Sequence, residues 1–292
     1  MGAIYNNKDK FSYSLLRDYH SLLELRLLEL ANARFVWKGK NSFSFNRCFL
    51  MLEGGGRMIN HTANQEYELR PGYAYFIPPR VELSYDFQPG ISLLSLHFQL
   101  YILPGVDVFD GETRCQELTL DPDRLKEFAC VMAKSPDWDA FCRFESLIWK
   151  LLSGIREPDS KRLEKLTSLH EKYGKVLQYI HNNISADMGV EEIAREAGVK
   201  RDTFSRHFSN DFEVPLKTFI MNELVAISER YLLHSELPVR EIASELKFSS
   251  EFYFSTFFKR LKGVSPTQFR AMRRKSDRKV RSHGKNSASR FK

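Results

Sequence analysis

"VREIASELKFSSEFYFSTFFKRLKGVSPTQF", residues 239–269, repeats an arrangement that the chain has already used once, in "VEEIAREAGVKRDTFSRHFSNDFEVPLKTF", residues 190–219. Corresponding residues are 49 apart in the first half of the unit and 50 apart in the second half, as in Phe204 and Phe254. One residue inserted in the turn accounts for the change. Duplication at this length indicates duplicated supersecondary structure.

Each copy is predicted to be a helix, a tight turn and a second helix. In the first copy, Ile193 and Ala194 lie on one helical face, and Gly198 supplies the left-handed position that ends a helix. Phe204 and Phe208 are four residues apart, so both face inward. The outward residues are then Asp202, Thr203, Arg206 and His207 in the first copy, and Glu251, Phe252, Ser255, Thr256 and Lys259 in the second.

The outward faces are typical of major-groove recognition, because short polar side chains on a second helix can reach base edges. The alternative is an ordinary helical hairpin whose outer face is merely solvated. Two copies joined by a helical segment, "PLKTFIMNELVAISERYLLHSE" at residues 215–236, favour the recognition hypothesis.

Residues 165–272 resemble the DNA-binding domain of AraC-type bacterial transcription regulators. The motifs that carry the resemblance are "EEIAREAGV", "TFSRHF", "LPVREIA" and "FYFSTFFKRLKGVSPTQF". The resemblance implies two helix-turn-helix units, at residues 188–209 and 238–260, held by a connecting helix. Such units read successive major-groove faces of one duplex, about 34 Å apart.

The resemblance also gives candidate contacts with double-stranded DNA. Because the second outward face is poor in charge, we expect the first unit to carry more of the binding. Phosphate contacts position a protein without reading sequence. The candidates for base edges or nearby phosphates are Lys200, Arg201, Asp202, Thr203, Arg206 and His207 in the first unit and Ser250, Glu251, Ser255 and Thr256 in the second, and those for phosphate clamps are Lys259, Lys262 and Arg270.

Three residues depart from the pattern of the family. Glu213 and Lys247 stand where the family usually has glycine, at turns that end helices. A left-handed conformation costs a residue other than glycine about 1 kcal/mol, unless the turn relaxes. Leu224 stands in the connecting helix where arginine is common.

Residues 35–115 are predicted to form a β-sandwich or small barrel. Short alternating runs are separated by turn residues at Gly54–Gly56, Pro71–Gly72, Pro78–Pro79 and Pro89–Gly90. "YELRPGYAYFIPP" resembles the cupin-like sensor domain of the same family, which implies an effector-binding jelly roll. The expected fold class is therefore α+β and multidomain, with a β-barrel followed by an all-α part.

A catalytic role for this barrel is not expected. Metal-dependent cupins need several histidines and a carboxylate around the ion. The barrel region holds only His61 and His97, and Leu83 stands where relatives often have histidine. The sequence therefore predicts no metal, no cofactor and no enzyme activity.

A small-molecule effector site in the barrel remains plausible, because barrels of this size can hold one ligand. Ser95 and His97 share one face of a strand, and Arg47, Tyr75 and Tyr85 are further candidates. The many aromatic residues suit a sugar or another flat ligand. The alternative for each of these residues is ordinary packing or surface exposure.

Helical segments are expected around the barrel. Residues 11–30 are predicted to form an amphipathic helix in a helical extension spanning 1–34. Residues 116–160 are expected to be a helical region for dimerisation and linkage, with two helices within 121–155 and the linker at 156–162. The resemblance implies a homodimer through these helices.

Charge divides the chain of 292 residues, whose net charge is +7, into an acidic front and a basic back. Residues 1–160 hold 18 basic and 21 acidic side chains, and residues 161–292 hold 26 and 16. A basic tail, 273–292, is expected to be disordered and either to add non-specific affinity or only to aid solubility. The four cysteines form no pairing pattern, and the sequence shows neither a secretory signal nor a membrane span. A cytoplasmic location is expected.

Together these observations predict a sequence-specific DNA-binding regulator controlled by an effector. RNA polymerase is a candidate partner, and activation is the tendency of the family. Two alternatives stay open: a cupin enzyme with an accessory DNA-binding domain, and a non-specific architectural DNA binder.

Overall fold

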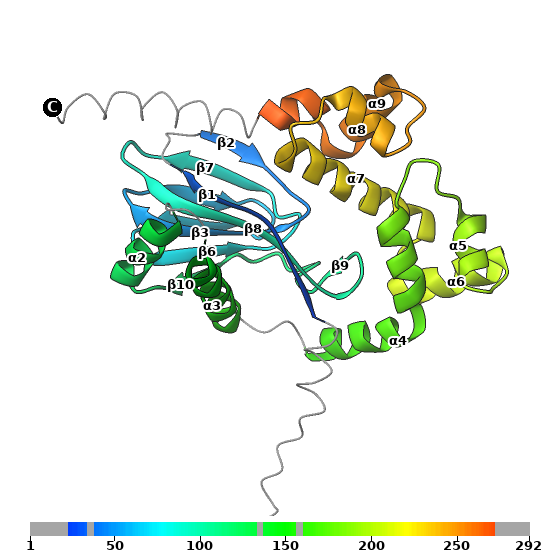
Figure 1. Ribbon diagram of the computed structural model, residues 1–292, viewed down its shortest axis with the longest axis horizontal. Helices are drawn as coiled ribbons and strands as arrows, with labels where there is room; N and C mark the ends of the chain where they lie inside the picture. The colour runs from blue at the N-terminus through cyan, green and yellow to red at the C-terminus, as the bar shows by residue number, and fades with distance from the viewer. Residues whose placement is uncertain (1–22, 34–37, 133–136, 156–159, 272–292) are drawn as a thin grey trace, which may run out of the picture.

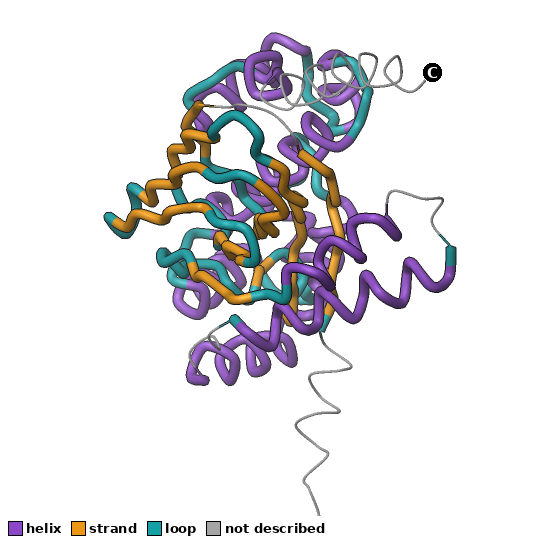
Figure 2. The backbone as a smooth tube through the Cα atoms, turned by 90° about the vertical axis from the view of Figure 1, so that its left-hand side faces the viewer, coloured by secondary structure: helices purple, strands orange, loops and turns teal. Residues whose placement is uncertain are grey.

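The computed structural model describes residues 23–33, 38–132, 137–155 and 160–271. The strands gather into one body, and helices lie on several sides of it (Figures 1 and 2). In chain order, the strands β1 to β10 come first, the helices α2 and α3 follow them, and the helices α4 to α9 make up the C-terminal part (Figure 1). The predicted α+β fold class is therefore confirmed.

The strands form two antiparallel sheets. One has six strands in the order β1-β8-β3-β6-β10, with β9 paired to β8, and the other has four in the order β2-β7-β4-β5. The strands are β1 (Glu24–Ala33), β2 (Lys38–Asn41), β3 (Asn46–Glu53), β4 (Gly56–Asn60), β5 (Gln65–Leu69), β6 (Tyr73–Ile77), β7 (Leu83–Phe87), β8 (Ser92–Leu103), β9 (Val106–Asp107) and β10 (Gln116–Thr119).

The side chains of β3 point alternately into two different hydrophobic cores. Phe49 and Met51 pack in the core shared by the two sheets, whereas Cys48 and Leu50 belong to the core that includes the helices. Successive side chains of a strand point to opposite faces, so β3 supplies both cores at once.

The first described strand corrects a prediction. Residues 24–33 were expected to be helical, yet they form β1 and pair with β8 from Glu24↔Tyr101 to Ala33↔Leu93. A short leucine-rich run is compatible with the period of a helix and with that of a strand. Pairing with the long strand β8 satisfies the backbone N–H and C=O groups of this segment. The predicted helix before residue 23 lies outside the described residues.

Two helices cover the outer face of the six-stranded sheet: α2 (Pro122–Met132) and α3 (Trp138–Gly154). α2 begins at a proline after an aspartate, and Asp121 Oδ1 accepts a hydrogen bond from the Asp123 backbone N–H at 3.1 Å. Asp137 caps α3 by accepting from the Ala140 N–H at 2.8 Å. These caps satisfy N–H groups that a helix cannot pair internally.

The helical part contains two helix-turn-helix units, α5–α6 and α8–α9, with α7 between them (Figure 1). Phe204 and Phe208 are buried, as predicted, and the corresponding Phe254 and Phe258 of the second copy are buried as well. The helices are α4 (Ser160–Asn183), α5 (Val190–Glu196), α6 (Arg201–Phe212), α7 (Leu216–His234), α8 (Val239–Glu245) and α9 (Glu251–Lys262).

The two residues that stand in place of glycine keep the left-handed conformation. Glu213 has φ 57° and Lys247 has φ 54°, so neither turn relaxes to avoid the strain. Both side chains are exposed, which leaves backbone conformation as the main constraint at these positions.

Candidate nucleic-acid interface

The first outward face consists of residues of α6 and of Lys200, the N-cap residue that precedes this helix. Lys200, Arg201, Asp202, Arg206 and His207 are all exposed. These predicted residues are therefore open to solvent, whereas the predicted Thr203 is half-buried.

The salt bridge within this unit is weak. The guanidinium of Arg201 lies 3.1 Å from Glu191 Oε1, and both side chains are more than half exposed. Pairs of this kind contribute little to stability. Arg201 can therefore exchange this carboxylate for another anion.

The second outward face lies on α9. Glu251, Thr256 and Lys259 are exposed, and Ser255 is half-buried. Ser250, a predicted DNA contact, caps α9 in this structure, because its Oγ accepts a hydrogen bond from the Tyr253 N–H at 3.1 Å.

Two aromatic side chains were not among the sequence candidates. Phe252 is 81% exposed and Tyr253 is 54% exposed in the first turn of α9. The helical period identifies Phe252 as outward-facing, but the abundance of core phenylalanines in this segment favoured hydrogen-bonding residues as candidates instead. Later in α9, Leu261 is exposed, whereas Phe257 is buried.

Two of the predicted phosphate clamps, Lys262 and Arg270, are held by other groups of the protein in this structure, and their contact with DNA stays a prediction. The Lys262 ammonium lies 2.5 Å from Glu229 Oε1 and donates a hydrogen bond to the Ser42 carbonyl at 3.1 Å. Arg270 is buried and its Nε donates to the Leu232 carbonyl at 3.2 Å. Both cations bind acceptors inside the protein, namely Glu229 and the Ser42 carbonyl for Lys262 and the Leu232 carbonyl for Arg270. These acceptors lie far away along the chain, so the sequence did not reveal them.

Glu229 of α7 connects the β-rich part to the second unit. Its side chain is fully buried, and it accepts hydrogen bonds from the Ser44 N–H at 2.8 Å and from the Ser44 hydroxyl. Its other oxygen pairs with Lys262. Removing one partner of a buried pair commonly costs about 3–5 kcal/mol. The loop at residues 42–44, between β2 and β3, is therefore bonded to both α7 and α9.

A second contact holds α4 and α7 against the sheet. Arg26 of β1 is hydrogen-bonded to His181 of α4, and Arg162 donates to the Val108 carbonyl at 3.0 Å. A Cβ atom on Gly105 would lie 2.7 Å from Glu223 Oε2, so α7 also approaches the β8–β9 turn closely.

The effector candidates separate into three places. Arg47 and Tyr85 meet in the interior between the sheets, where Arg47 donates to the Tyr85 hydroxyl and, at 2.7 Å, to Asn41 Oδ1. The guanidinium lies 4.8 Å from the centre of the Phe43 ring. Burial raises the pKa of Tyr85 to about 12, so its phenol stays neutral. Arg47 is buried, and within the described residues no carboxylate lies within 4.0 Å of it.

The remaining candidates do not join this pair. Ser95 Oγ lies 3.1 Å from His97 Nε2, and the His97 ring is 5.8 Å from that of His234 at the end of α7. His97 is thus a hydrogen-bonded histidine at the domain contact. Tyr75 donates to the Glu68 carbonyl at 2.6 Å, which fixes a turn elsewhere in the sheet.

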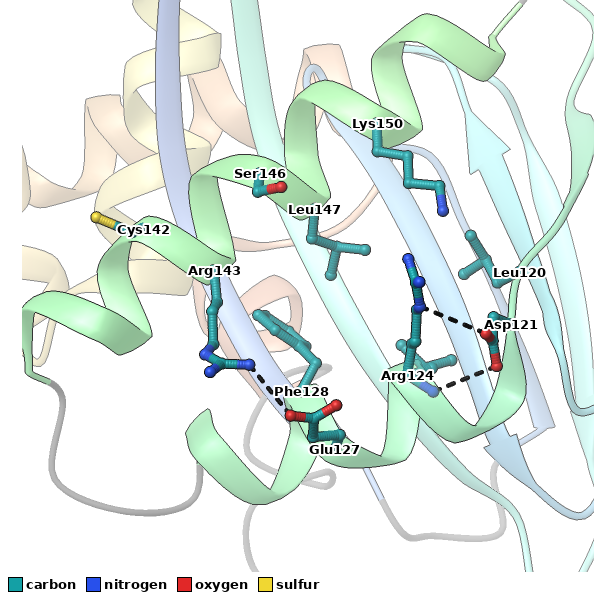
Figure 3. A pocket seen from close by; sticks show the side chains of 11 residues that line it. Leu120, Asp121, Arg124, Glu127, Phe128, Cys142, Arg143, Ser146, Leu147 and Lys150 are labelled. Carbon is teal, nitrogen blue, oxygen red and sulfur yellow. Dashed lines mark hydrogen bonds and ion pairs between the residues drawn. The ribbon is translucent and has the colours of Figure 1, made fainter.

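A surface hollow of about 560 Å³ lies between α2 and α3 (Figure 3). Phe128 and Leu147 supply apolar walls, and Arg143 pairs with Glu127 at 3.1 Å. Lys150 extends into the hollow from α3 (Figure 3). Sequence reasoning did not identify this hollow, because only the packing of the two helices creates it.

A different face of α3 carries exposed aromatic side chains. Trp138 is 77% exposed, Phe141 51% and Trp149 44%. The Trp138 and Phe141 rings stack at 5.4 Å. Helical spacing places all three on one side of α3, so they form an apolar stripe in contact with solvent.

The described residues contain neither a cluster of potential metal ligands nor a helix that could span a membrane. Within them, no group of three or more His, Cys, Asp or Glu side chains is arranged to hold a metal ion. The helices found there are too short or too polar to cross a membrane.

Comparison with known proteins agrees with this arrangement. Residues 193–272 match the family model described as a helix-turn-helix domain. The chain is 28% identical over 125 residues to the Msm operon regulatory protein of Streptococcus mutans, covering 42% of this chain and 45% of that protein. It is 26% identical over 120 residues to the transcriptional regulator ExsA of Pseudomonas aeruginosa, covering 41% and 40%. The chain thus spans less than half the length of both curated relatives.

Among solved structures, ToxT of Vibrio cholerae matches with a TM-score of 0.52 over 86% of this chain and 98% of that one, at 13% identity. At this identity the match concerns the fold alone. It supports a sheet-rich domain followed by a helical helix-turn-helix domain.

Proposed function

We propose that the protein is a sequence-specific DNA-binding transcription regulator of the AraC type, a proposal supported by the match of residues 193–272 to a helix-turn-helix family model. The observation that carries the proposal is the pair of exposed outward faces on α6 and α9, each backed by buried phenylalanines. Exposed recognition helices joined by one connecting helix suit two successive major-groove faces.

Binding measurements test this proposal. The full-length protein is used to select duplexes from a random-sequence library, and affinity for a selected duplex is compared with that for scrambled duplexes at matched salt. A regulator binds its selected sequence at least a thousandfold more tightly. Equal affinities would support a non-specific architectural protein and contradict the proposal.

We further propose that the β-rich part controls the second unit through the loop at residues 42–44. Arg47 supports this loop from inside, through Asn41 and the Phe43 ring. The same loop holds Glu229 and Lys262 from outside. An effector that engages Arg47 or Tyr85 competes with these internal bonds and shifts the position of α9.

Hydrogen–deuterium exchange tests this coupling without a known effector. Arg47→Met removes the internal support, so we expect faster exchange in residues 42–44 and at the C-terminal end of α9. Tyr75→Phe is the matched control, because its lost hydroxyl contacts the Glu68 carbonyl rather than the loop. Unchanged exchange in α9 of Arg47→Met would show that the two parts are not coupled by this route.

We propose that the regulator is a homodimer formed through α3. The apolar stripe of Trp138, Phe141 and Trp149 supports this proposal, since exposed apolar stripes on helices commonly pack against a partner. A dimer would present two pairs of recognition helices to paired sites.

A further inference from the structure

Phe252 is the most exposed large apolar side chain in the described part of the chain, at 81%. Trp138 comes next at 77%, but it stacks on Phe141. No aromatic ring within the described residues stacks on Phe252 in this way. Burying such a side chain against a partner would stabilise a complex by about 1.5–3 kcal/mol.

The position of Phe252 restricts what that partner is. It lies in the first turn of α9, two residues before the buried Phe254. The N-terminal residues of a recognition helix are the ones that contact base edges. Arg260 and Lys259 are exposed later in the same helix, which favours an anionic partner.

The internal duplication supplies a comparison within the same molecule. At the offset of 50, Phe252 corresponds to Asp202, and Thr256 corresponds to Arg206. Arginine reads guanine through bidentate hydrogen bonds, whereas phenylalanine makes apolar contact with the thymine methyl group. The two outward faces therefore differ in chemistry, although their cores match.

We propose that Phe252 is a specificity-determining residue that selects thymine, by packing its ring against the C5-methyl group in the major groove under α9. This inference rests on the proposed DNA-binding function and adds the base that one side chain reads. It predicts a thymine in the half of the site that faces the second unit.

Deoxyuridine substitution tests the contact, since deoxyuridine lacks only the methyl group of thymine. The probe is the tightest duplex that the full-length protein selects from a random library, with each thymine replaced in turn. We expect affinity to fall about fourfold at one or two positions, the equivalent of about 0.8 kcal/mol for one buried carbon. Fluorescence anisotropy measures the affinity.

Variants assign this sensitivity to the residue. Phe252→Ala should bind the unmodified duplex more weakly and show no further loss on deoxyuridine substitution at those positions. Asp202→Ala, the equivalent change in the first unit, should keep the full sensitivity. Circular dichroism establishes that both variants remain folded.

The outcomes separate this inference from the proposed function. If Phe252→Ala keeps the wild-type sensitivity, or if no position is sensitive, Phe252 does not read thymine although the protein still binds DNA. If Phe252→Ala keeps full DNA affinity and only promoter activity falls, the ring contacts a protein and the inference is wrong. If the library yields no preferred sequence, the proposed function itself fails, and this inference fails with it.

Discussion

At the scale of single residues, the chain tolerates strain where a glycine would relieve it. Lys247 keeps φ 54° at the turn after α8, and Glu213 keeps φ 57° after α6. The sequence showed that these positions were unusual. Only the backbone angles established that the turns stay left-handed.

Lys247→Gly should therefore raise the free energy of unfolding by up to about 1 kcal/mol, because glycine adopts this conformation without strain. Urea denaturation at constant m-value measures the change. Ser244→Gly, three residues earlier in the helix, is the matched control and should destabilise the protein instead. If both substitutions destabilise equally, strain at Lys247 is negligible.

Lys259 and Lys262 give a second prediction, since they differ in burial although they are only three residues apart. Lys259 is exposed, whereas Lys262 is paired with Glu229. Lys259→Gln should reduce the slope of log K against log salt for DNA binding by about 0.9, the value for one lost phosphate contact. Lys262→Gln should leave the slope unchanged and lower stability. A reduced slope for Lys262→Gln would mean that this ammonium reaches DNA after all.

At the scale of elements, the two helix-turn-helix units share a core and differ on their outer faces. Buried phenylalanines recur at matching positions in α6 and α9. The exposed residues of α6 include two arginines, whereas the N-terminal turn of α9 presents Glu251, Phe252 and Tyr253. The duplication thus preserves packing while leaving each outer face free to change.

This asymmetry predicts unequal effects on operator affinity. Arg206→Ala should weaken binding by about 1–3 kcal/mol, the range for a bidentate base contact. Thr256→Ala, at the equivalent position of the second unit, should weaken it less. Titrations of both variants against the selected duplex measure the difference. Equal losses would show that the two units contribute equally.

At the scale of the whole molecule, several contacts among the described residues tie the helical part to the sheets. They include the loop at residues 42–44 with Glu229 and Lys262, the contact of Arg26 with His181, and the hydrogen bond from Arg162 to the Val108 carbonyl. A change within the sheets therefore has a bonded route to α7 and α9. This arrangement suits control of DNA binding by an effector.

The proposed dimer gives the prediction at this scale. Trp149→Lys should convert dimers to monomers, because a charge replaces an apolar side chain in the stripe on α3. Sedimentation equilibrium measures the association. Ser146→Lys, on the α3 face that lines the hollow, is the control and should leave the dimer intact. A monomeric wild-type protein, or equal effects of both variants, would contradict the proposed interface.

The sequence by itself determined the two repeated units, because helical periodicity and internal repetition are local properties of a chain. It also determined the inward phenylalanines, the strand-rich front half and the unusual Glu213 and Lys247. Tertiary structure alone decided that residues 24–33 join a sheet, since pairing with β8 is a non-local contact. It also decided that Lys262 is buried against Glu229, 33 positions away along the chain (262 − 229 = 33). Such contacts depend on the packing of distant segments, which no local pattern records.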